Sequence, residues 1–423
     1  MVTQLRSQLA ARSWLVVAGV AAGLCFIGLW VLAAPGAGAS TSGKRVVGAV
    51  YTQTNSPAGN SVVVFNRFGD GTLKKRQSVG TGGKGSTQSV GCGPGCPLLD
   101  SQNAVVVSKN GKFVFAVNAG SDTVTSFRKT ASGLKRVSQV SSGGNMPESL
   151  AFHGNLLYVL NVSTTNPNAT TGNIYGLRIA SNGKLSPVGS SRTLANLAPP
   201  DRSADPRAID FKPNGKVIVV TELAAGFAGT GPPGRIDTFV VGSNGKAGPA
   251  VAHPASDALP FGFAFDNSGH LVVSQIRSPA GNVDGSVSTY KVTDSGGVTA
   301  IDTKPSGGIL PCWVVVSSDG RYAYVVNTGA GHPAPVTRFR LGSGGKLTAL
   351  SPPAASRSGE FARTDAALSQ GSKFLYVLAP KVGPGNASHI DAYRRTANGG
   401  LKFIGSTRPG ANIGIGATGL AAR

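Results

Sequence analysis

Apolar residues in this chain fall into short runs that glycine turns separate. Clear examples cover residues 113–117, 156–160, 217–220, 322–326 and 374–378, and each is rich in β-branched or aromatic residues. These residue types favour β-strands, and nearly continuous apolar runs are typical of strands covered on both faces. Helical periodicity is absent after the N-terminal segment. The pattern therefore predicts an all-β protein with buried strands.

Two kinds of tight turn recur with these strands. One kind stands directly before an apolar run, at Gly111, Gly215, Gly269, Gly320 and Gly371. The other leads into an outgoing strand and occurs seven times, at Gly71, Gly133, Gly183, Gly245, Gly296, Gly345 and Gly399. Asn-Gly and Asp-Gly pairs supply the positive φ that two-residue hairpin turns need. The copies recur every 49–62 residues.

A period near fifty residues, made of strands and turns, is typical of a β-propeller, so seven copies predict seven blades. The first repeat has strands at residues 46–52 and 61–65 and an outgoing strand from Leu73, but no innermost strand precedes them. Residues 415–421 at the C-terminus have the pattern of that missing strand. We therefore expect the C-terminal strand to join the first blade and close the ring, which pairs an edge that would otherwise stay open.

The first 39 residues differ from the repeats. Arg6 and Arg12 precede an uncharged stretch over residues 14–34, and Ala37-Gly38-Ala39 follows. This order is typical of a secretory signal peptide, but the stretch is also long enough to span a bilayer. We expect a cleaved signal or an N-terminal membrane anchor, a linker at residues 40–44, and one propeller domain over residues 45–423. Either alternative places the domain outside the cytoplasm, as a secreted or anchored protein.

Cysteine usage agrees with an oxidising compartment. Cys92 and Cys96 lie in a Gly/Ser-rich insertion over residues 80–101, and a disulfide between them is the simplest interpretation. A metal site is the alternative, although this pair lacks a second pair of ligands. Cys312 is left over, either as a buried thiol or as a partner of the cysteines in the insertion.

The net charge is +22, which raises the question of a polyanionic partner. The basic residues are scattered over hairpin turns, as at Lys112, Lys184 and Lys346, and no nucleic-acid recognition motif accompanies them. We therefore expect no nucleic-acid partner, and either attraction to anionic cell-wall polymer or lipid headgroups or a solvated surface without a specific partner. The five His residues show no ligand spacing, so no metal or cofactor is expected. A monomer is expected.

Propellers place their sites where the innermost strands converge at the mouth of the central channel. The first residues of the predicted innermost strands mix charged and apolar side chains, as a site for a small polar ligand would. They are Asn103, Glu148, Arg207, Phe261, Cys312 and Arg363.

The fourth repeat carries the most specific pair of charges. Arg207 begins one strand, in Asp205-Pro206-Arg207, and Glu222 ends its hairpin partner, so both are expected at the same rim of one blade. Two interpretations follow. The two side chains form a structural ion pair with each other, or they flank an anionic substrate with Glu222 as acid or base.

This repeat resembles the fourth blade of the seven-bladed lactonase family, which includes bacterial 6-phosphogluconolactonases and fungal carboxymuconate cyclases. The shared features are Pro206-Arg207, the turn at Asn214-Gly215-Lys216 and the strand that ends in Glu222-Leu223, and the repeat rhythm matches over residues 45–423. The resemblance implies a hydrolase or cyclase for a small lactone or carboxylate, with Arg207 and Glu222 in the active site. Arg277 is the nearest match to a second active-site Arg, offset by about one position.

Two positions depart from the family pattern. Ala208 stands where the family has a His after the Pro-Arg pair, and Pro147-Glu148-Ser149 stands where an earlier blade carries another His. The resemblance then leaves Glu222 to move the proton. Export also separates the protein from 6-phosphogluconolactone, a cytosolic intermediate. The alternative function is a non-catalytic envelope propeller that binds cell-wall polymer or a protein partner.

Overall fold

The structure is a computed structural model that describes residues 44–87, 99–163, 172–195, 205–223, 234–255, 259–276, 284–328, 334–355, 363–379, 388–407 and 416–423. The chain divides into Met1–Gly43 and Lys44–Arg423. The predicted signal or anchor, Cys92, Cys96 and Arg277 lie outside the described residues. Within the described ranges, no helix is long and apolar enough to cross a membrane.

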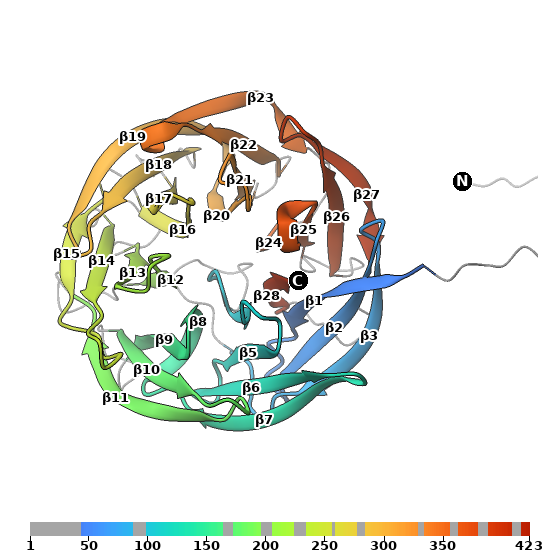
Figure 1. Cartoon of the computed structure of the whole chain (residues 1–423), viewed down its shortest axis with the longest axis vertical. Helices are drawn as coiled ribbons and strands as arrows, with labels where there is room; N and C mark the ends of the chain where they lie inside the picture. The colour runs from blue at the N-terminus through green and yellow to red at the C-terminus, as the bar shows by residue number, and fades with distance from the viewer. Residues whose placement is uncertain are drawn as a thin grey trace, which may run out of the picture. The chain divides into compact units, whose positions relative to one another are not determined.

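Seven four-stranded antiparallel sheets surround a central axis (Figure 1), which confirms the predicted seven-bladed propeller. In blade order 1 to 7, the innermost strands are β28 (Thr418–Ala422), β4 (Val105–Val107), β8 (Asn145–His153), β12 (Pro206–Phe211), β16 (Leu259–Phe265), β20 (Pro311–Val316) and β24 (Ala366–Leu368). The second strands are β1 (Val46–Gln53), β5 (Phe113–Asn118), β9 (Leu156–Ser163), β13 (Val217–Glu222), β17 (His270–Ile276), β21 (Tyr322–Asn327) and β25 (Phe374–Ala379).

The outer half of each blade completes the sheet. The third strands are β2 (Ser61–Phe68), β6 (Thr123–Thr130), β10 (Asn173–Ile179), β14 (Arg235–Val240), β18 (Asp284–Val292), β22 (Val336–Leu341) and β26 (His389–Arg395). The outermost strands are β3 (Leu73–Gly80), β7 (Gly133–Ser141), β11 (Leu185–Thr193), β15 (Val251–Pro254), β19 (Val298–Ile309), β23 (Leu347–Ala355) and β27 (Leu401–Thr407). Two 3-10 turns, η1 (Ser343–Gly345) and η2 (Gln370–Ser372), are the helical elements of the described chain.

Burial explains the hydrophobic pattern of the sequence. Every residue of β5, β13, β21 and β25 is buried, because neighbouring blades cover both faces of these strands. The outermost strands are instead largely exposed, as in β3, where mainly Leu73 is buried. The apolar runs of the sequence are therefore the second strands of the blades.

The C-terminal strand closes the ring as predicted. In β28, Ala421 lies opposite Tyr51 of β1, and Ala422 lies opposite Val50. The backbone bonds extend one residue further, since the Ala49 amide donates to the Arg423 carbonyl at 2.7 Å and the Arg423 amide donates back at 2.8 Å. The first blade is thus built from both ends of the propeller domain.

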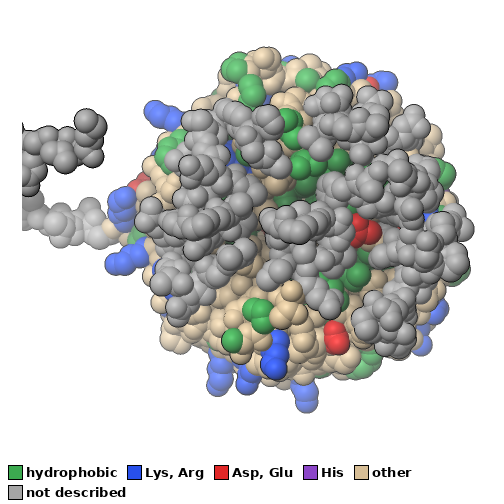
Figure 2. Space-filling view, turned by 180° about the vertical axis from the view of Figure 1, so that it is seen from behind, with side chains coloured by type: hydrophobic (Ala, Val, Ile, Leu, Met, Phe, Trp, Pro, Cys, Tyr) green, Lys and Arg blue, Asp and Glu red, His purple; other side chains and the backbone are tan. Residues whose placement is uncertain are grey.

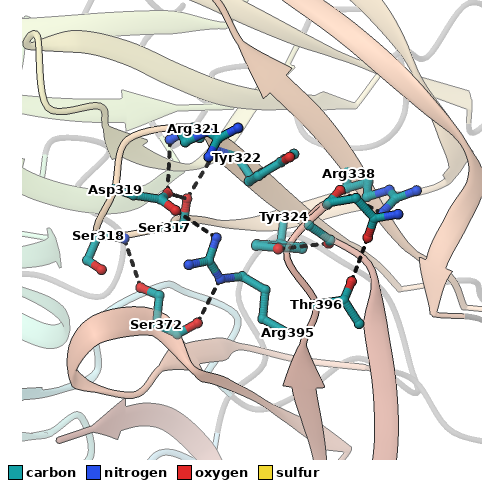
Figure 3. A network of polar contacts seen from close by, with 12 residues as sticks. Ser317, Ser318, Asp319, Arg321, Tyr322, Tyr324, Arg338, Ser372, Arg395 and Thr396 are labelled. Carbon is teal, nitrogen blue, oxygen red and sulfur yellow. Dashed lines mark hydrogen bonds and ion pairs between the residues drawn. The ribbon is translucent and has the colours of Figure 1, made fainter.

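Adjacent blades are joined by a repeated hydrogen bond from a buried tyrosine to a turn glycine. The hydroxyls of Tyr158, Tyr324 and Tyr376 donate to the carbonyls of Gly245, Gly399 and Gly71 in the next blade, at 2.8, 2.8 and 3.0 Å. Figure 3 shows the junction of blades 6 and 7, where Arg395 also donates to the Ser372 carbonyl and to the Asp319 carboxylate, both at 2.9 Å. The recurring turns therefore also connect the blades.

The arrangement of basic side chains can be followed on one face of the molecule. On the face seen in Figure 2, Lys and Arg side chains lie around the margin and do not gather into one patch. The figure therefore agrees with the scattered pattern that the sequence shows.

Deleting residues 418–423 is expected to destabilise the whole ring, because it reopens β1 and removes the pairing that joins the two ends. We expect a fall of more than about 10 °C in the midpoint of thermal unfolding, followed by circular dichroism. A truncated chain that unfolds at the wild-type temperature would contradict the role of β28 in closure.

A glycine pair gives a milder test of the same strand. Gly419 has φ +72°, and a methyl group there would lie 2.7 Å from the Val105 amide nitrogen. Gly154 has φ +59° with open space around it. Gly154→Ala should cost about 1 kcal/mol for its left-handed backbone, and Gly419→Ala should cost clearly more in urea unfolding. Equal losses would show that β28 is not tightly packed against blade 2.

Candidate active site

The innermost strands of blades 3 to 6 share a β-bulge directly after a proline. The register shifts between Pro147 and Ser149, between Pro206 and Ala208, between Pro260 and Phe263, and between Pro311 and Trp313. A bulged residue is left out of the ladder, so its side chain is aimed differently from those of its neighbours. The residues placed in these bulges include Glu148, Arg207, Phe261 and Cys312, four members of the ring that the sequence predicted.

The backbone enters these strands through an unusual conformation. Met146, Asp205 and Leu310 precede three of the prolines and have φ of 54°, 49° and 52°. Asn103 and Asp365, at the entrances of blades 2 and 7, have φ of 67° and 66°. Left-handed residues other than glycine are uncommon and concentrate where a structure holds a side chain in a required position. Five of the eight left-handed residues other than glycine in the described backbone therefore lie at the entrances of innermost strands.

Residues 99–103, called here the channel segment, connect the innermost strands of several blades. The segment bonds to Glu148 of β8, Arg207 of β12, Phe263 of β16, Trp313 of β20 and Thr418 of β28. The Gln102 side chain alone donates to the Phe263 carbonyl at 2.7 Å and accepts from the Val314 amide at 3.2 Å. The segment therefore crosses the axis of the ring and fills it with bonded polar groups.

Arg207 lies in this buried polar centre. Its side chain is fully buried, and Nη2 donates to both carboxylate oxygens of Asp205 at 2.7 and 2.8 Å. Nη1 donates to the Asp100 carbonyl at 2.9 Å and lies 3.7 Å from its carboxylate, while the guanidinium lies 5.4 Å from the centre of the Phe261 ring. Burial opposes the charge, but the acids Asp205, Asp100 and Glu148 together raise the pKa of Arg207, so it stays cationic.

Glu148 reaches the same centre from blade 3. Its side chain is fully buried, and neither carboxyl oxygen has a hydrogen-bond partner within the described part of the chain. Burial raises the pKa of Glu148 well above its usual range; Arg207 opposes this rise, and Asp205 and Asp100 add to it. Burial likewise raises the pKa of Asp100 to about 6. Two of the acids near Arg207, Glu148 and Asp100, therefore have raised pKa values.

The predicted pairing of Arg207 with Glu222 is not formed. The register opposes Pro206 to Glu222, so the two residues do share one rim, as expected. The bulge aims Arg207 toward the channel segment, whereas Glu222 accepts a hydrogen bond from Arg235 Nη2 at 2.9 Å. Glu222 therefore belongs to a separate group of charges on β13 and β14.

That second group contains a carboxyl pair. Asp237 lies two residues beyond Arg235 in β14, diagonal to Glu222, and two neighbouring buried carboxyls favour a state in which one of them carries a proton. Burial raises the pKa of Glu222 well above its usual range, and Asp237 adds to the rise. Asp237 also accepts from the Ala195 amide at 2.7 Å, at the end of blade 3. The pair thus lies where blade 4 meets blade 3.

The remaining predicted residues have structural contacts. Asn103 donates to the Ile209 carbonyl at 3.3 Å. Arg363 is buried within blade 7, where it donates to the Tyr393 hydroxyl at 3.1 Å and lies 3.7 Å from Asp391. Cys312 is a buried free thiol whose pKa burial raises, so it is not a partner of the cysteines in the insertion.

The sequence analysis did not identify four charged residues that build the two groups, Asp100, Asp205, Arg235 and Asp237. Asp205 directly precedes Pro206, and this adjacency to the bulge was the available signal. Arg235 and Asp237 alternate with Ile236 at the start of β14, which marks one polar face of a buried strand. Asp100 lies near the end of the long insertion, and no sequence pattern there indicates that the chain returns to the axis of the ring. In the described ranges, no three His, Cys, Asp or Glu side chains are placed to hold a metal ion.

Comparison with known proteins confirms the resemblance to the lactonases. The family profile "Lactonase, 7-bladed beta-propeller" matches residues 56–196. No curated protein is similar enough in sequence to match the chain. Among solved structures, the periplasmic gluconolactonase of Pseudomonas aeruginosa is similar with a TM-score of 0.62 at 18% identity, covering 88% of this chain and 98% of that one.

Two Bacteroides proteins, whose 6-phosphogluconolactonase activity is an inference, are similar to the same extent. The protein from Bacteroides uniformis has a TM-score of 0.60 at 21% identity and covers 86% of this chain and 97% of its own. The protein from Bacteroides fragilis has a TM-score of 0.62 at 17% identity and covers 90% and 98%. At these identities the structural likeness shows the shared propeller fold.

The carboxyl pair predicts a specific pH dependence of stability. The pKa of Glu222 is raised in the folded state. Its stabilising contribution to the free energy of unfolding is therefore fully present below the unfolded-state pKa of about 4.3, and it is lost as the pH rises toward the folded-state pKa. Glu222→Gln removes this loss, so the free energy of unfolding should fall less steeply between pH 5 and 8, by up to about 1.4 kcal/mol per pH unit. Urea unfolding at several pH values measures the slope.

Asp294→Asn provides the matched control for that slope. Asp294 is ion-paired with Lys212 and Lys216 on the surface, and hydrogen bonds from these lysines lower its pKa. Its titration is complete below pH 5, so the slope above pH 5 should not change. Equal slopes for wild type and Glu222→Gln would overturn the proton-sharing pair.

Proposed function

We propose that the protein is a lactonase that opens a small lactone ring at the mouth of its propeller. The observation that carries the proposal is Arg207, which a bulge places in a buried centre among acids with raised pKa values. Arg207 can stabilise the negative charge that develops on the carbonyl oxygen when water adds to an ester. The match of residues 56–196 to the lactonase profile supports the same chemistry.

The proposed contact of Arg207 is with the carbonyl oxygen of the ring. Its guanidinium is already bonded to Asp205 and lies near Asp100, so these acids balance its charge. A carbonyl that becomes an oxyanion needs the guanidinium only as the charge develops, which favours the transition state over the bound substrate. The sequence predicts a small anionic lactone or carboxylate as the substrate, and the assay described below compares the turnover of anionic lactones with that of neutral ones. Since Arg207 and Glu148 are fully buried, binding has to displace the atoms that cover them.

The expected result is lactone turnover by the full chain, measured as proton release from sugar, aliphatic and muconate-type lactones, each in neutral and anionic form. Arg207→Lys keeps the positive charge but loses the planar guanidinium and its paired N–H donors, so we expect turnover to fall about 100-fold. Arg395→Lys, at the junction of blades 6 and 7 in Figure 3, is the control and should keep wild-type turnover. Absence of turnover on every lactone would favour the envelope-binding alternative, which binding to cell-wall fractions then tests.

We also propose that residues 1–39 direct the propeller out of the cytoplasm. The basic start, the uncharged stretch and Ala37-Gly38-Ala39 support export. The expected outcome is recovery of the protein outside the cytoplasm, either with a new N-terminus near residue 40 or as the full chain in the membrane fraction. N-terminal sequencing of each cell fraction distinguishes the two forms, and a full-length cytoplasmic protein would contradict export.

A further inference from the structure

Glu148 is the one acid around Arg207 whose carboxyl has no hydrogen-bond partner in the described structure. Its backbone is fixed, because its carbonyl accepts from Ser101 Oγ at 2.6 Å and the next residue, Ser149, donates its hydroxyl to the Gln102 carbonyl. Its carboxyl oxygens are nevertheless unbonded and fully buried. Native proteins rarely leave a buried carboxyl without a partner, so such a group requires an explanation.

The charges around Arg207 single out Glu148 over Glu222. The channel segment ties Glu148 to Arg207, because Ser101 Oγ donates to the Glu148 carbonyl and the next amide, that of Gln102, donates to the Arg207 carbonyl. The acids that act on the guanidinium are Asp205, Asp100 and Glu148. Glu222 instead accepts a hydrogen bond from Arg235 of the neighbouring strand β14, which also carries Asp237. A group that exchanges a proton with a substrate held by Arg207 must lie beside Arg207 and have a free oxygen. Glu148 meets both conditions.

On the basis of the proposed lactonase activity, we infer that Glu148, and not Glu222, takes and returns the proton during ring opening. In this assignment Glu148 is a catalytic residue and Arg207 stabilises the oxyanion. Glu222 has a structural role, since its pairing with Arg235 and Asp237 holds blade 4 where it meets blade 3.

The reaction balances with these two residues and one water molecule. Water adds to the carbonyl carbon while the Glu148 carboxylate removes one of its protons, and the carbonyl electron pair moves onto the oxygen beside Arg207. The tetrahedral intermediate then collapses, the bond from the carbonyl carbon to the ring oxygen breaks, and the ring oxygen takes the proton from Glu148. Glu148 returns to its starting state, and the new carboxylic acid releases its proton to the solvent.

The electrostatic environment suits this role. Burial raises the pKa of Glu148, and Arg207 draws it back down. A carboxyl poised between these effects is basic enough to take a proton from water and acidic enough to return it. Because the ionised form starts the reaction, activity should rise with pH through the pKa of Glu148.

The test measures kcat and KM of the full chain on the best lactone of the panel. Glu148→Gln has the shape of the protonated side chain and should lower kcat at least 100-fold while changing KM less than threefold. Asp210→Asn is the matched control. Burial also raises the pKa of Asp210, to about 7, but its carboxylate accepts from the Phe211 amide at 2.7 Å, and the described structure gives it no contact with Arg207. This control should keep wild-type kcat.

A second variant keeps the assignment testable if Glu148→Gln does not fold. Glu148→Asp retains a carboxyl but shortens the side chain by one methylene group, which changes the position of the carboxyl relative to Arg207 and so its pKa. This variant should therefore shift the acid limb of the pH–rate profile as well as lower kcat. A structural role alone would lower the amount of folded protein and leave that limb in place. An unshifted limb would overturn the assignment.

The outcomes separate the inference from the activity on which it rests. A wild-type chain without turnover on any lactone removes the proposed function. An active wild type with an active Glu148→Gln variant removes the inference alone, and loss of activity in Glu222→Gln would then restore the role predicted from the sequence. Loss of kcat in Glu148→Gln together with the shifted limb in Glu148→Asp supports Glu148.

Discussion

Closure of the ring by β28 is the constraint on which the rest of the structure depends. Each blade buries its faces against two neighbours, so a ring that opened at blade 1 would expose β1 and the innermost position beside it. Pairing of residues 418–422 with β1 joins the two ends of the domain. The tyrosine-to-glycine bonds between blades then maintain the spacing at the turns.

Closure also brings the innermost strands together around the channel segment. The carbonyls, amides and side chains of residues 99–103 bond to the innermost strands of five other blades. Buried polar groups are costly unless they are bonded, so this segment adopts the path that satisfies them. The prolines and bulges at the starts of the strands aim Glu148 and Arg207 at the same region.

Two groups of buried charge result, and they have different physical character. Around Arg207 a single guanidinium faces several acids, and one carboxyl remains unbonded. Around Glu222 the carboxyl accepts one hydrogen bond from Arg235 of the same blade, and Asp237 lies on the same strand as Arg235. Each group leaves a buried carboxyl oxygen without a hydrogen-bond partner in the described structure, but only the carboxyl of Glu148, in the group at Arg207, has both oxygens unbonded. The chemistry that we propose uses the group at the mouth, and the role that we propose for the group at the junction of blades 3 and 4 is structural.

The sequence by itself determined the seven blades, the order of their strands and the closure, because turn glycines and buried apolar strands are local features that repeat. It also placed Arg207 and Glu148 at the mouth, through the prolines that precede them. Tertiary structure alone decided their partners. Asp100 is 107 residues from Arg207 and meets it only because residues 99–103 return to the axis, while a bulge separates Arg207 from Glu222. Such pairings depend on ring geometry and backbone direction, which no local pattern encodes.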